Sequence, residues 1–281
     1  MVTAVSEHRE IDVLHLGNPR AICCHQLGDV LVDPGPESSH ATVLAALDGQ
    51  VPARILLTHI HFDHAGATGR LLEHWPDCEV WVHERGARHL VDPSRLVASA
   101  TRIYGDDMQR LWGEVVPVPE ERLTVLTGGE TLGEWRVAYT PGHASHHVSY
   151  LHEPSGIAFV GDVGGVRIGG GATIPPTPPP DIDLELWHAS VDRVAEWGAE
   201  RWAITHYGTF DDVAAQAQAM HEGLERWGAL ARDTDAETYE REVVAEMHRG
   251  VDPATAEAFL QAMPPFTLYP GLERYWAKKN G

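Results

Sequence analysis

The sequence predicts an α/β protein in which layers of strands and helices stack on one another. Short apolar runs rich in Val, Ile and Leu alternate with amphipathic segments, and Gly, Pro and Asp bound the runs. A chain of 281 residues is long enough to bury a large core in one domain, or in one domain with an appendage. Two β-rich halves with helices outside fit a layered sandwich.

The apolar runs predict strands, of which the early ones look like hairpins and the later ones are interleaved with helices. The expected strands are Ile11–Leu16, Ala21–Cys24, Val30–Val32, Ile55–Leu57, Val80–Val82, Leu123–Leu126, Trp135–Tyr139, Val148–Leu151, Ile157–Val160 and Trp202–Ile204. The expected helices are Ser39–Leu47, Ala67–His74, Arg85–Val91, Ser94–Leu111, Leu184–Glu196 and a long one from about Asp211 to Arg232.

The character of the chain changes after Phe210, because the remaining pattern is helical with only turn-like breaks. We therefore expect residues 1–210 to form the main domain and residues 211–281 to form a helical extension. The segment Gly169–Pro180, GGGATIPPTPPP, is expected to be a loop, since its prolines remove backbone donors and force extended geometry.

The formal net charge of −20 disfavours nucleic-acid partners, because an acidic surface repels phosphate backbones. No apolar run reaches the length of about 18 residues that a membrane span needs. The first residues, MVTAVSEHREIDVL, lack the basic start and apolar core of a secretory signal, so we expect a cytoplasmic protein. The three cysteines, Cys23, Cys24 and Cys78, form no CxxC pair and are interpreted as small buried side chains.

Four potential metal ligands fall within six residues, directly after an apolar strand, in the segment ILLTHIHFDHAG. They are His59, His61, Asp63 and His64. Imidazole and carboxylate are standard ligands for Zn²⁺, and also for Fe²⁺ or Mn²⁺. Residues two apart in an extended chain point the same way, so His59 and His61 can hold one ion. Asp63 and His64 lie past the turn and can face a second ion.

The HxHxDH pattern after a hydrophobic strand resembles the metallo-β-lactamase-fold superfamily. Further segments resemble this superfamily in the same order along the chain: LVDPG at Leu31–Gly35 upstream, and TPGH ending at His143, FVGD ending at Asp162 and ITHYG containing His206 downstream. The resemblance spans roughly residues 11 to 208 and implies a four-layer αββα sandwich. It also implies two divalent metal ions per chain, with zinc as the first expectation and iron or manganese as alternatives.

The resemblance assigns a ligand set to each ion: His59, His61 and His143 for the first, Asp63, His64 and His206 for the second, with Asp162 bridging both. A carboxylate has two oxygens and can span two ions, which one imidazole cannot do. The alternatives are that Asp162 caps a turn before Gly164 and that His206 is a core histidine.

Several neighbouring residues carry a second interpretation. By residue type alone, His146 or His147 could be the ligand as well as His143, but only His143 sits in a PGH sequence. We expect Asp33 to hydrogen-bond the metal loop rather than to touch a metal. Arg167 is either an exposed loop arginine or a contact to an anionic group of the substrate. Tyr207 either contacts the substrate or packs in the core. His83, His89 and His188 show no ligand spacing and are interpreted as structural.

Two divalent ions held about 3.5–4 Å apart share a bridging water and lower its pKa toward neutrality. The resulting hydroxide attacks an electrophilic carbon or phosphorus, and Asp63 orients it, which makes Asp63 the candidate catalytic residue. No Ser or Cys nucleophile is required. This chemistry predicts hydrolysis by direct attack of water, without a covalent intermediate.

The bridging Asp162 and the lack of a Cys ligand resemble the glyoxalase II branch of thioester hydrolases, or neighbouring lactonases and phosphodiesterases. A helical extension after the last histidine ligand also resembles glyoxalase II. Arg167 is the only basic residue in the segment after Asp162, VGGVRIGGGATIPPTPPP, which disfavours glutathione. The expected function is hydrolysis of a small carbonyl ester or thioester. The alternatives are a lactonase or phosphodiesterase, and a metal-binding regulatory protein with little turnover.

The expected partner is a small-molecule substrate, with no nucleic acid and no membrane. Substrate choice is expected to lie in the Gly164–Pro180 loop and in the helices after Asp211, because the metal ligands fix only the reaction. The glycines of Gly169–Gly171 are a candidate hinge in that loop. The alternative role of the helical extension is to form a homodimer.

Overall fold

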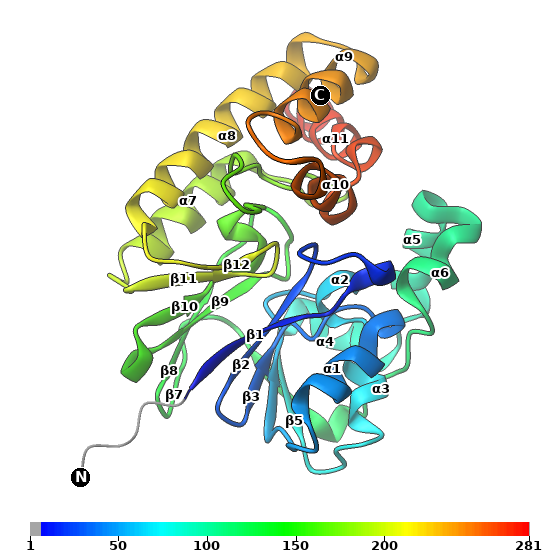
Figure 1. Cartoon of the computed structure of the whole chain (residues 1–281), viewed down its shortest axis with the longest axis vertical. Helices are drawn as coiled ribbons and strands as arrows, with labels where there is room; N and C mark the ends of the chain where they lie inside the picture. Colours follow the sequence, from blue (N-terminus) through cyan, green and yellow to red (C-terminus); the bar gives the residue numbers. More distant parts are fainter. Residues whose placement is uncertain (1–6, 281) are drawn as a thin grey trace.

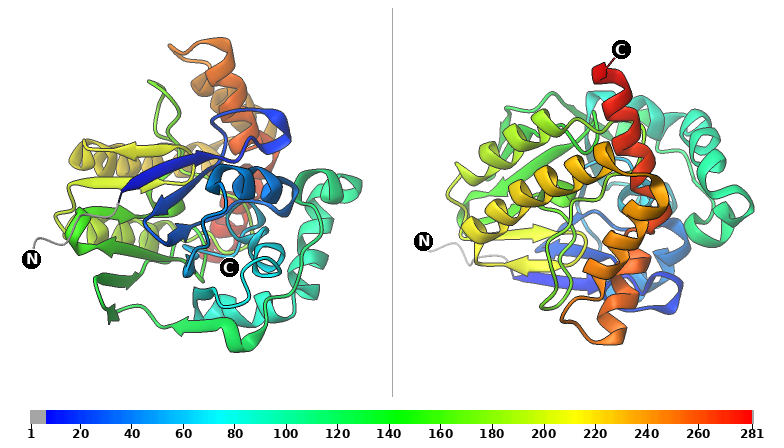
Figure 2. Two further views of the ribbon diagram at one scale, coloured as in Figure 1. Left: turned by 60° about the horizontal axis from the view of Figure 1, so that its bottom comes forward. Right: turned by 90° about the horizontal axis from the view of Figure 1, so that it is seen from above.

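Two six-stranded sheets pack face to face in the computed structural model, which describes residues 7–280, and helices cover both outer faces (Figure 1). This arrangement is the four-layer αββα sandwich that the sequence predicts. Views from two further directions show the same layering, with the C-terminal helices gathered beside one helix layer (Figure 2).

The first sheet has the strand order β1-β2-β3-β4-β5-β6. Its strands are β1 (His8–Asp12), β2 (Cys23–Leu27), β3 (Val30–Val32), β4 (Arg54–Leu56), β5 (Glu79–His83) and β6 (Leu123–Leu126). The pairs β1/β2 and β2/β3 are antiparallel, whereas the strands from β3 to β6 run parallel. Helices α1 (His40–Leu47), α3 (Thr68–Leu72) and α4 (Glu84–Val91) contribute buried apolar side chains to the outer core on this sheet.

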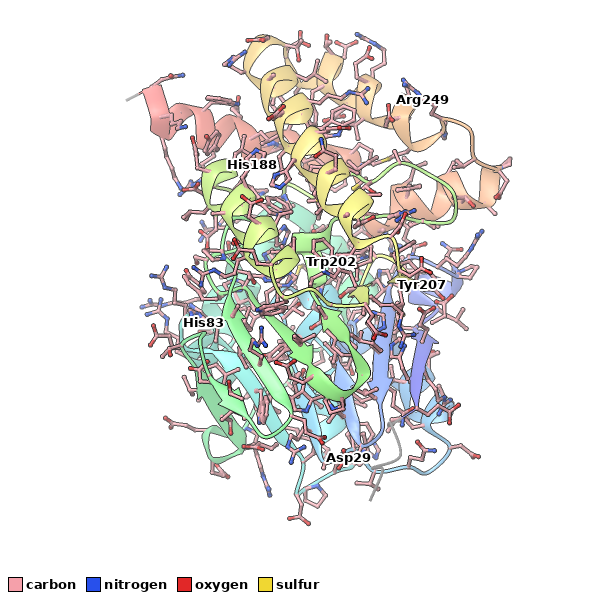
Figure 3. The ribbon with its side chains drawn as sticks, turned by 90° about the vertical axis from the view of Figure 1, so that its left-hand side faces the viewer. Asp29, His83, His188, Trp202, Tyr207 and Arg249 are labelled. Carbon is pink, nitrogen blue, oxygen red and sulfur yellow. The ribbon has the colours of Figure 1, made fainter. Side chains whose placement is uncertain are left out.

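The second sheet has the order β12-β11-β10-β9-β8-β7. Its strands are β7 (Thr131–Leu132), β8 (Trp135–Tyr139), β9 (Val148–His152), β10 (Ile157–Phe159), β11 (Arg201–Ile204) and β12 (Gly208–Phe210). All its pairs are antiparallel except β10/β11. Helices α7 (Leu184–Ala195) and α8 (Val213–Asp233) cover its outer face, where Trp202 of β11 packs with Trp187 of α7 (Figure 3).

The core between the sheets follows from the period-two alternation of the strands. In β5, Val80 and Val82 face the helices, whereas Trp81 joins the inter-sheet cluster with Leu56 and Phe159. Burying a large apolar side chain of this kind stabilises the fold by roughly 1.5–3 kcal/mol. Because both sheets use one face for this cluster, their strand ends are held in fixed positions relative to each other.

The C-terminal segment adds α9 (Ala236–Met247), α10 (Pro253–Ala262) and α11 (Tyr269–Asn280). Asp235 and Asp252 cap the first turns of α9 and α10 by accepting hydrogen bonds from backbone N–H groups. Residues of these helices share one buried cluster with α7, α8 and the second sheet. The extension therefore packs on the sandwich, while its status as a separate domain stays a prediction. Among residues 7–280, no helix combines the length and apolar character needed to cross a bilayer.

The prediction of a single helix at Ser94–Leu111 is wrong. The segment is divided into α5 (Ser94–Tyr104) and α6 (Met108–Trp112) by Gly105, whose φ of 54° is incompatible with a right-handed helix. The break lets α6 turn back, so that Tyr104 and Trp112 meet with ring centroids 5.2 Å apart.

The first two strands are displaced from their expected positions. Strand β1 ends at Asp12, because Leu14 and Leu16 adopt left-handed backbone angles and the Asp12 carboxylate accepts hydrogen bonds from the N–H groups of Leu14 and Arg20. The expected mixing of later strands with helices is also wrong for β7–β10, which form an antiparallel meander. The short strands β7 and β12 lack an apolar run, so the sequence pattern did not indicate them.

We predict that Gly271→Ala destabilises the protein by about 1–3 kcal/mol, because an added methyl group would clash with the carbonyl oxygen of Thr177. The reason is that α11 packs at backbone distance on the proline-rich loop. Gly170→Ala is the matched control, since its methyl group would meet no atom within 4 Å. Denaturant unfolding of both variants checks this, and equal stabilities would show that α11 is not packed there.

Candidate metal centre

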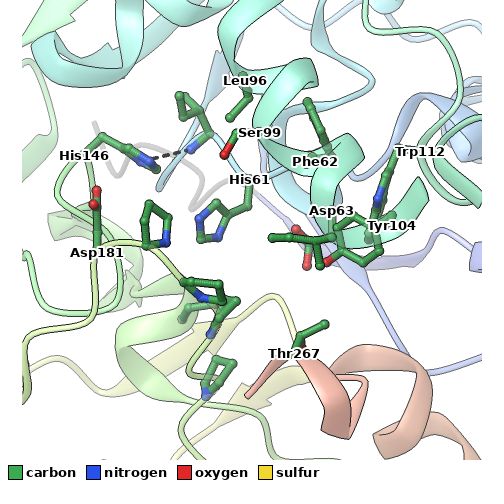
Figure 4. Close-up of a pocket in the computed structure, with 18 of the residues that line it drawn as sticks. His61, Phe62, Asp63, Leu96, Ser99, Tyr104, Trp112, His146, Asp181 and Thr267 are labelled. Carbon is green, nitrogen blue, oxygen red and sulfur yellow. Dashed lines mark hydrogen bonds between the residues drawn. The ribbon is translucent and has the colours of Figure 1, made fainter. Parts of the chain in front are cut away.

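The predicted ligands lie together at one edge of the sandwich, where strands of both sheets end. Within its sheet, each ligand segment follows a strand: His59 and His61 follow β4, His143 follows β8, Asp162 follows β10 and His206 follows β11. Parallel strands present their carboxyl ends at the same edge, which is where an α/β scaffold places functional groups. Figure 4 shows His61 and Asp63 side by side at the cavity that opens there.

The segment after β4 is not a loop throughout, because it makes one helical turn, α2 (Phe62–Ala65). His61 precedes this turn with extended backbone angles (φ −62°, ψ 151°). The turn directs Asp63 and His64 toward a second group of side chains. Sequence spacing indicated that these two residues face a different partner from His59 and His61, but it did not indicate the helical turn.

The first group consists of His59, His61 and His143, whose potential ligand atoms all lie within 4.8 Å of one another. Nε2 of His59 lies 2.9 Å from Nδ1 of His61, and Nε2 of His143 lies 3.0 Å from the same atom. Three ring nitrogens from two sheets thus converge on one point.

The second group consists of Asp63, His64 and His206, which also lie within 4.8 Å of one another. Oδ2 of Asp63 lies 3.3 Å from Nε2 of His206 and 3.8 Å from Nε2 of His64. His64 and His206 are buried, whereas Asp63 keeps 21% of its side chain exposed. The carboxylate of this group therefore faces the cavity.

Asp162 lies between the two groups and turns one oxygen to each. Its Oδ2 lies 3.3 Å from Nε2 of His143 and 4.0 Å from Nε2 of His59. Its Oδ1 lies 3.2 Å from Nε2 of His64 and 3.8 Å from Nε2 of His206. Although burial alone raises the pKa of Asp162, the surrounding imidazoles hold it well below its usual value. The side chain is therefore an ionised carboxylate between two sets of nitrogens.

The outward ring nitrogens of three histidines donate to fixed oxygens, which turns Nε2 of each ring inward. The acceptors of the Nδ1–H groups are the Pro176 carbonyl for His143 (2.9 Å), the Ala21 carbonyl for His206 (2.7 Å) and the Asp33 carboxylate for His64 (2.8 Å). The same arrangement orients metal-binding histidines in proteins generally.

Burial lowers the pKa of the histidines in the first group, for His61 to about 4. Neighbouring imidazoles lower the pKa of His59 and His61 further. A neutral imidazole is the form that binds a metal. At His64 burial alone also lowers the pKa, but the nearby carboxylates, led by Asp162, raise it above its usual value.

Two buried atoms at the centre lack a hydrogen-bond partner among the described residues: Nε2 of His64 and Oδ1 of Asp162. They lie 3.2 Å apart without forming a hydrogen bond of acceptable geometry. Unpaired buried polar atoms are rare in native proteins and call for an explanation. A cation held between them satisfies both lone pairs, so the residues present fit metal ions.

Asp33 hydrogen-bonds this region, as the sequence predicts, and is fully buried. Its Oδ1 accepts from the N–H of Thr58 (2.8 Å), and its Oδ2 accepts from the hydroxyls of Thr58 (2.6 Å) and Thr205 (2.8 Å) and from His64. Although burial alone raises the pKa of Asp33, the His64 ring and the Thr58 hydrogen bonds lower it. An ionised Asp33 therefore joins both sheets behind the histidines.

The other two histidines near His143 in the sequence, His146 and His147, belong to neither of the two ligand groups. His147 is buried beside Thr140, with Nδ1 2.9 Å from the Thr140 hydroxyl, and burial lowers its pKa to about 3. His146 accepts a hydrogen bond from the N–H of Ile60 (3.4 Å) and lines the cavity (Figure 4).

Arg167 and Tyr207 do not lie in the cavity as the structure describes it for residues 7–280. Both terminal nitrogens of Arg167 donate to Asp212 (2.7 and 2.9 Å), and its guanidinium lies 4.3 Å from the centre of the Phe210 ring. Arg167 thus anchors its loop to the start of α8. Tyr207 packs against the core on the helix side of the second sheet (Figure 3).

The three cysteines are buried, as expected.

The sequence model of the metallo-beta-lactamase superfamily matches residues 22–206, well over half of the chain. The chain belongs to this superfamily. All the residues of the two ligand groups, together with Asp162, fall within the matched range. The family resemblance that the sequence motifs indicated is thereby confirmed.

A superfamily member of Sulfurisphaera tokodaii, the metallo-beta-lactamase fold-containing protein ST1585, is 30% identical over 196 residues, which cover 66% of this chain and 71% of that protein. The hydroxyacylglutathione hydrolase of Salmonella typhi is 31% identical over 137 residues, which cover 47% of this chain and 41% of that enzyme. The chain thus spans less than half the length of the hydroxyacylglutathione hydrolase that it matches.

Solved structures of superfamily members show the same fold. The crystal structure of ST1585 aligns with a TM-score of 0.73 at 23% identity, covering 96% of this chain and 99% of that one. The structure of TTHA1623 in a di-iron-bound form aligns with a TM-score of 0.51 at 28% identity, covering 68% of this chain and 87% of that one.

The site of this superfamily member opens into a cavity of about 660 Å³. Besides the metal-site residues and their neighbours Ile60 and Phe62, its walls come from four segments: residues 85–112, 145–146, 176–181 and 262–268. In Figure 4, Leu96 and Ser99 of α5 lie on one side and Thr267 lies opposite, with His61 and Asp63 between them. A cavity of this size accommodates an organic molecule of moderate size.

These walls differ partly from the expectation. The proline-rich loop contributes Pro176 and its neighbours, but the extension contributes the end of α10 and the turn after it rather than α8. The candidate hinge Gly169–Gly171 packs against Thr255 and Phe259 of α10, away from the cavity. The contribution of α4–α6 to the walls was not anticipated, although the arginines along these segments, in a chain with 41 acidic and 21 basic residues, were a signal.

We predict that Asp33→Asn destabilises the protein by about 3 kcal/mol or more, because an amide cannot accept all of these hydrogen bonds and leaves buried donors unpaired. Asp29→Asn, in the exposed turn between β2 and β3, is the control. Thermal and denaturant unfolding measure both variants, and an unchanged midpoint for Asp33→Asn would contradict the role given to this carboxylate.

Proposed function

We propose that the chain is a binuclear metal-dependent hydrolase of a small carbonyl ester or thioester. The observation that carries the proposal is the position of Asp162, whose two oxygens face two separate sets of imidazole nitrogens. A single metal site needs no carboxylate in that position. His59, His61 and His143 would hold one ion, Asp63, His64 and His206 the other, and Asp162 both.

Divalent ions held by these residues supply Lewis acidity, which acidifies water and polarises a carbonyl oxygen. Nitrogen and oxygen ligands of this kind suit zinc, iron and manganese. TTHA1623, which has the same fold, was solved in a di-iron-bound form, so iron stands beside zinc as a candidate for this chain.

Asp63 is proposed to orient the attacking water. Its Oδ2 approaches His206 and His64, yet part of its side chain reaches the cavity. Although burial alone raises its pKa, the neighbouring His64 and His206 rings lower it, so Asp63 is ionised and can accept a hydrogen bond from water. The described site requires no serine or cysteine nucleophile, so water adds directly to the carbonyl carbon.

A thioester or ester substrate is supported by the similarity to the hydroxyacylglutathione hydrolase of Salmonella typhi, whose name specifies an acyl thioester substrate. Glutathione itself is not part of the proposal. The basic residue of the loop after Asp162, Arg167, is paired with Asp212 and turned away from the cavity.

We predict that the purified protein, produced with ample metal, contains two ions per chain by elemental analysis. His143→Ala should lower that number because it removes one inward nitrogen of the first group. His146→Ala, three residues away and also at the cavity, is the matched control and should retain both ions. Equal metal contents in the two variants would contradict the assignment of His143, and one ion in the unaltered protein would contradict a binuclear site.

We predict that Asp63→Ala lowers kcat for the preferred substrate by about a hundredfold or more. The substrate is found by assaying a thioester, an aryl ester, a lactone, an aryl phosphodiester and a β-lactam. Turnover highest with the thioester or ester supports the proposal, and a preference for the lactone or phosphodiester would replace it. Metal binding with no turnover of any substrate would favour a regulatory role.

A further inference from the structure

The cavity wall formed by α4 and α5 carries three arginines: Arg85, Arg88 and Arg95. They come from adjacent helices, two from α4 and one from α5, and all are exposed. The chain as a whole has 41 acidic and only 21 basic residues. A concentration of arginines in one cavity is therefore unusual for this composition.

None of the three arginines forms an ion pair with a carboxylate of residues 7–280. Arg70, by contrast, contacts the carboxylates of Glu37, Glu73 and Glu114. With carboxylates twice as abundant as basic groups, unpaired arginines in a cavity are not explained by a shortage of partners.

Glu84 and Asp92 are the acidic residues adjacent to the arginines in the sequence, and neither forms an ion pair with Arg85, Arg88 or Arg95. The Nε–H of Arg88 donates to Nε2 of His89 (3.2 Å), and Arg85 lies 5.6 Å from the centre of the Tyr139 ring. Burial, Arg88 and Arg95 together lower the pKa of His89, which also lines the cavity and was expected to be only structural. His89 therefore stays neutral and accepts a hydrogen bond from Arg88.

The acidic residues of the cavity face other groups. Asp63 and Asp162 face the histidines of the metal centre. Asp181 accepts a hydrogen bond from the Ser145 hydroxyl (2.5 Å) and lies beside His146 (Figure 4). The arginine wall thus retains positive potential inside an otherwise acidic protein, and such a cleft concentrates anions.

The remaining wall is apolar and aromatic. Leu96, Ile103 and Tyr104 of α5 and Trp112 of α6 line the cavity near the arginines. Figure 4 shows Tyr104 and Trp112 together beside Asp63. The same cavity thus brings together the residues of the candidate metal centre, an apolar surface and guanidinium groups.

We propose that Arg85, Arg88 and Arg95 bind an anionic group, a carboxylate or a phosphate, carried by the substrate at the end away from the bond that is hydrolysed. This inference rests on the proposed ester or thioester hydrolysis, whose substrate class it narrows to anionic acyl compounds. Guanidinium groups suit both anions, because they present paired N–H donors to paired oxygens.

The kinetic test compares three esters with one leaving group: para-nitrophenyl butanoate, mono-para-nitrophenyl glutarate and the phosphonate analogue of the glutarate. In the metal-loaded, unaltered protein, the anionic esters should have the higher kcat/KM. In the combined variant Arg85→Gln, Arg88→Gln, Arg95→Gln, the ratio of anionic to neutral kcat/KM should fall about tenfold or more, mainly through KM. Added salt should shrink the same ratio in the unaltered protein.

Arg102→Gln is the matched control. Arg102 also lies on α5, is exposed and has no ion pair among the described residues, but it does not line the cavity. The ratio should not change in this variant. If the ratio of anionic to neutral kcat/KM fell equally in both variants, the effect would come from net charge alone and the inference would be overturned. An unchanged ratio in the combined variant would overturn it as well.

Binding measurements separate this inference from the proposed hydrolysis. The para-nitroanilides of the same three acids resist hydrolysis, and their affinities are measured by calorimetry on the metal-loaded protein. Tighter binding of an anionic anilide, lost in the combined variant and kept in Arg102→Gln, supports the arginine site even if no ester is hydrolysed. Equal affinities for all three anilides would overturn it. A preference between the glutarate and the phosphonate compounds identifies the anion.

Discussion

The geometry of the site depends on the hydrogen bonds that the buried carboxylate of Asp33 accepts. It lies after β3 in the first sheet, and its oxygens hold the end of β4 through Thr58, the helical turn α2 through His64, and the end of β11 in the second sheet through Thr205. A buried carboxylate is tolerated only when such donors surround it. The network therefore fixes the relative position of the two sheets at the edge where the histidines converge.

The other buried carboxylates of the site are likewise stabilised by the groups around them. Asp33, Asp63 and Asp162 bring negative charge into a buried region, and the imidazoles beside them hold it in ionised form. The outward ring nitrogens of His64, His143 and His206 are satisfied by backbone carbonyls or by Asp33, whereas the inward Nε2 of His64 and the Oδ1 of Asp162 are not. A region built this way gains its full complement of interactions only with a cation in place, so stability and metal binding are coupled.

The cavity joins segments that are far apart in the chain. The metal-site residues occupy its floor, α4–α6 contribute aromatic and basic side chains, and the proline-rich loop closes another side. That loop is held from behind, because Thr177 donates a hydrogen bond to the carbonyl of Leu268 (3.0 Å) and α11 packs against it at Gly271. The C-terminal helices thus act on the cavity mainly by fixing the loop, and residues 262–268 contribute wall directly.

The sequence by itself determined the layered fold, most strand positions and the pairing of His59 with His61, because apolar runs and ligand spacing are local properties. The rest of the converging set, including His143, Asp162 and His206, came from the resemblance of their motifs to the superfamily. The break at Gly105, the turn α2 and the left-handed residues after β1 were decided by local backbone geometry that composition does not reveal. Only the tertiary structure decided which oxygen of Asp162 faces which group, and that three arginines of α4 and α5 share a cavity with the candidate metal centre. These facts depend on how two sheets and their helices pack, and packing joins residues whose separation along the chain carries no signal of their contact.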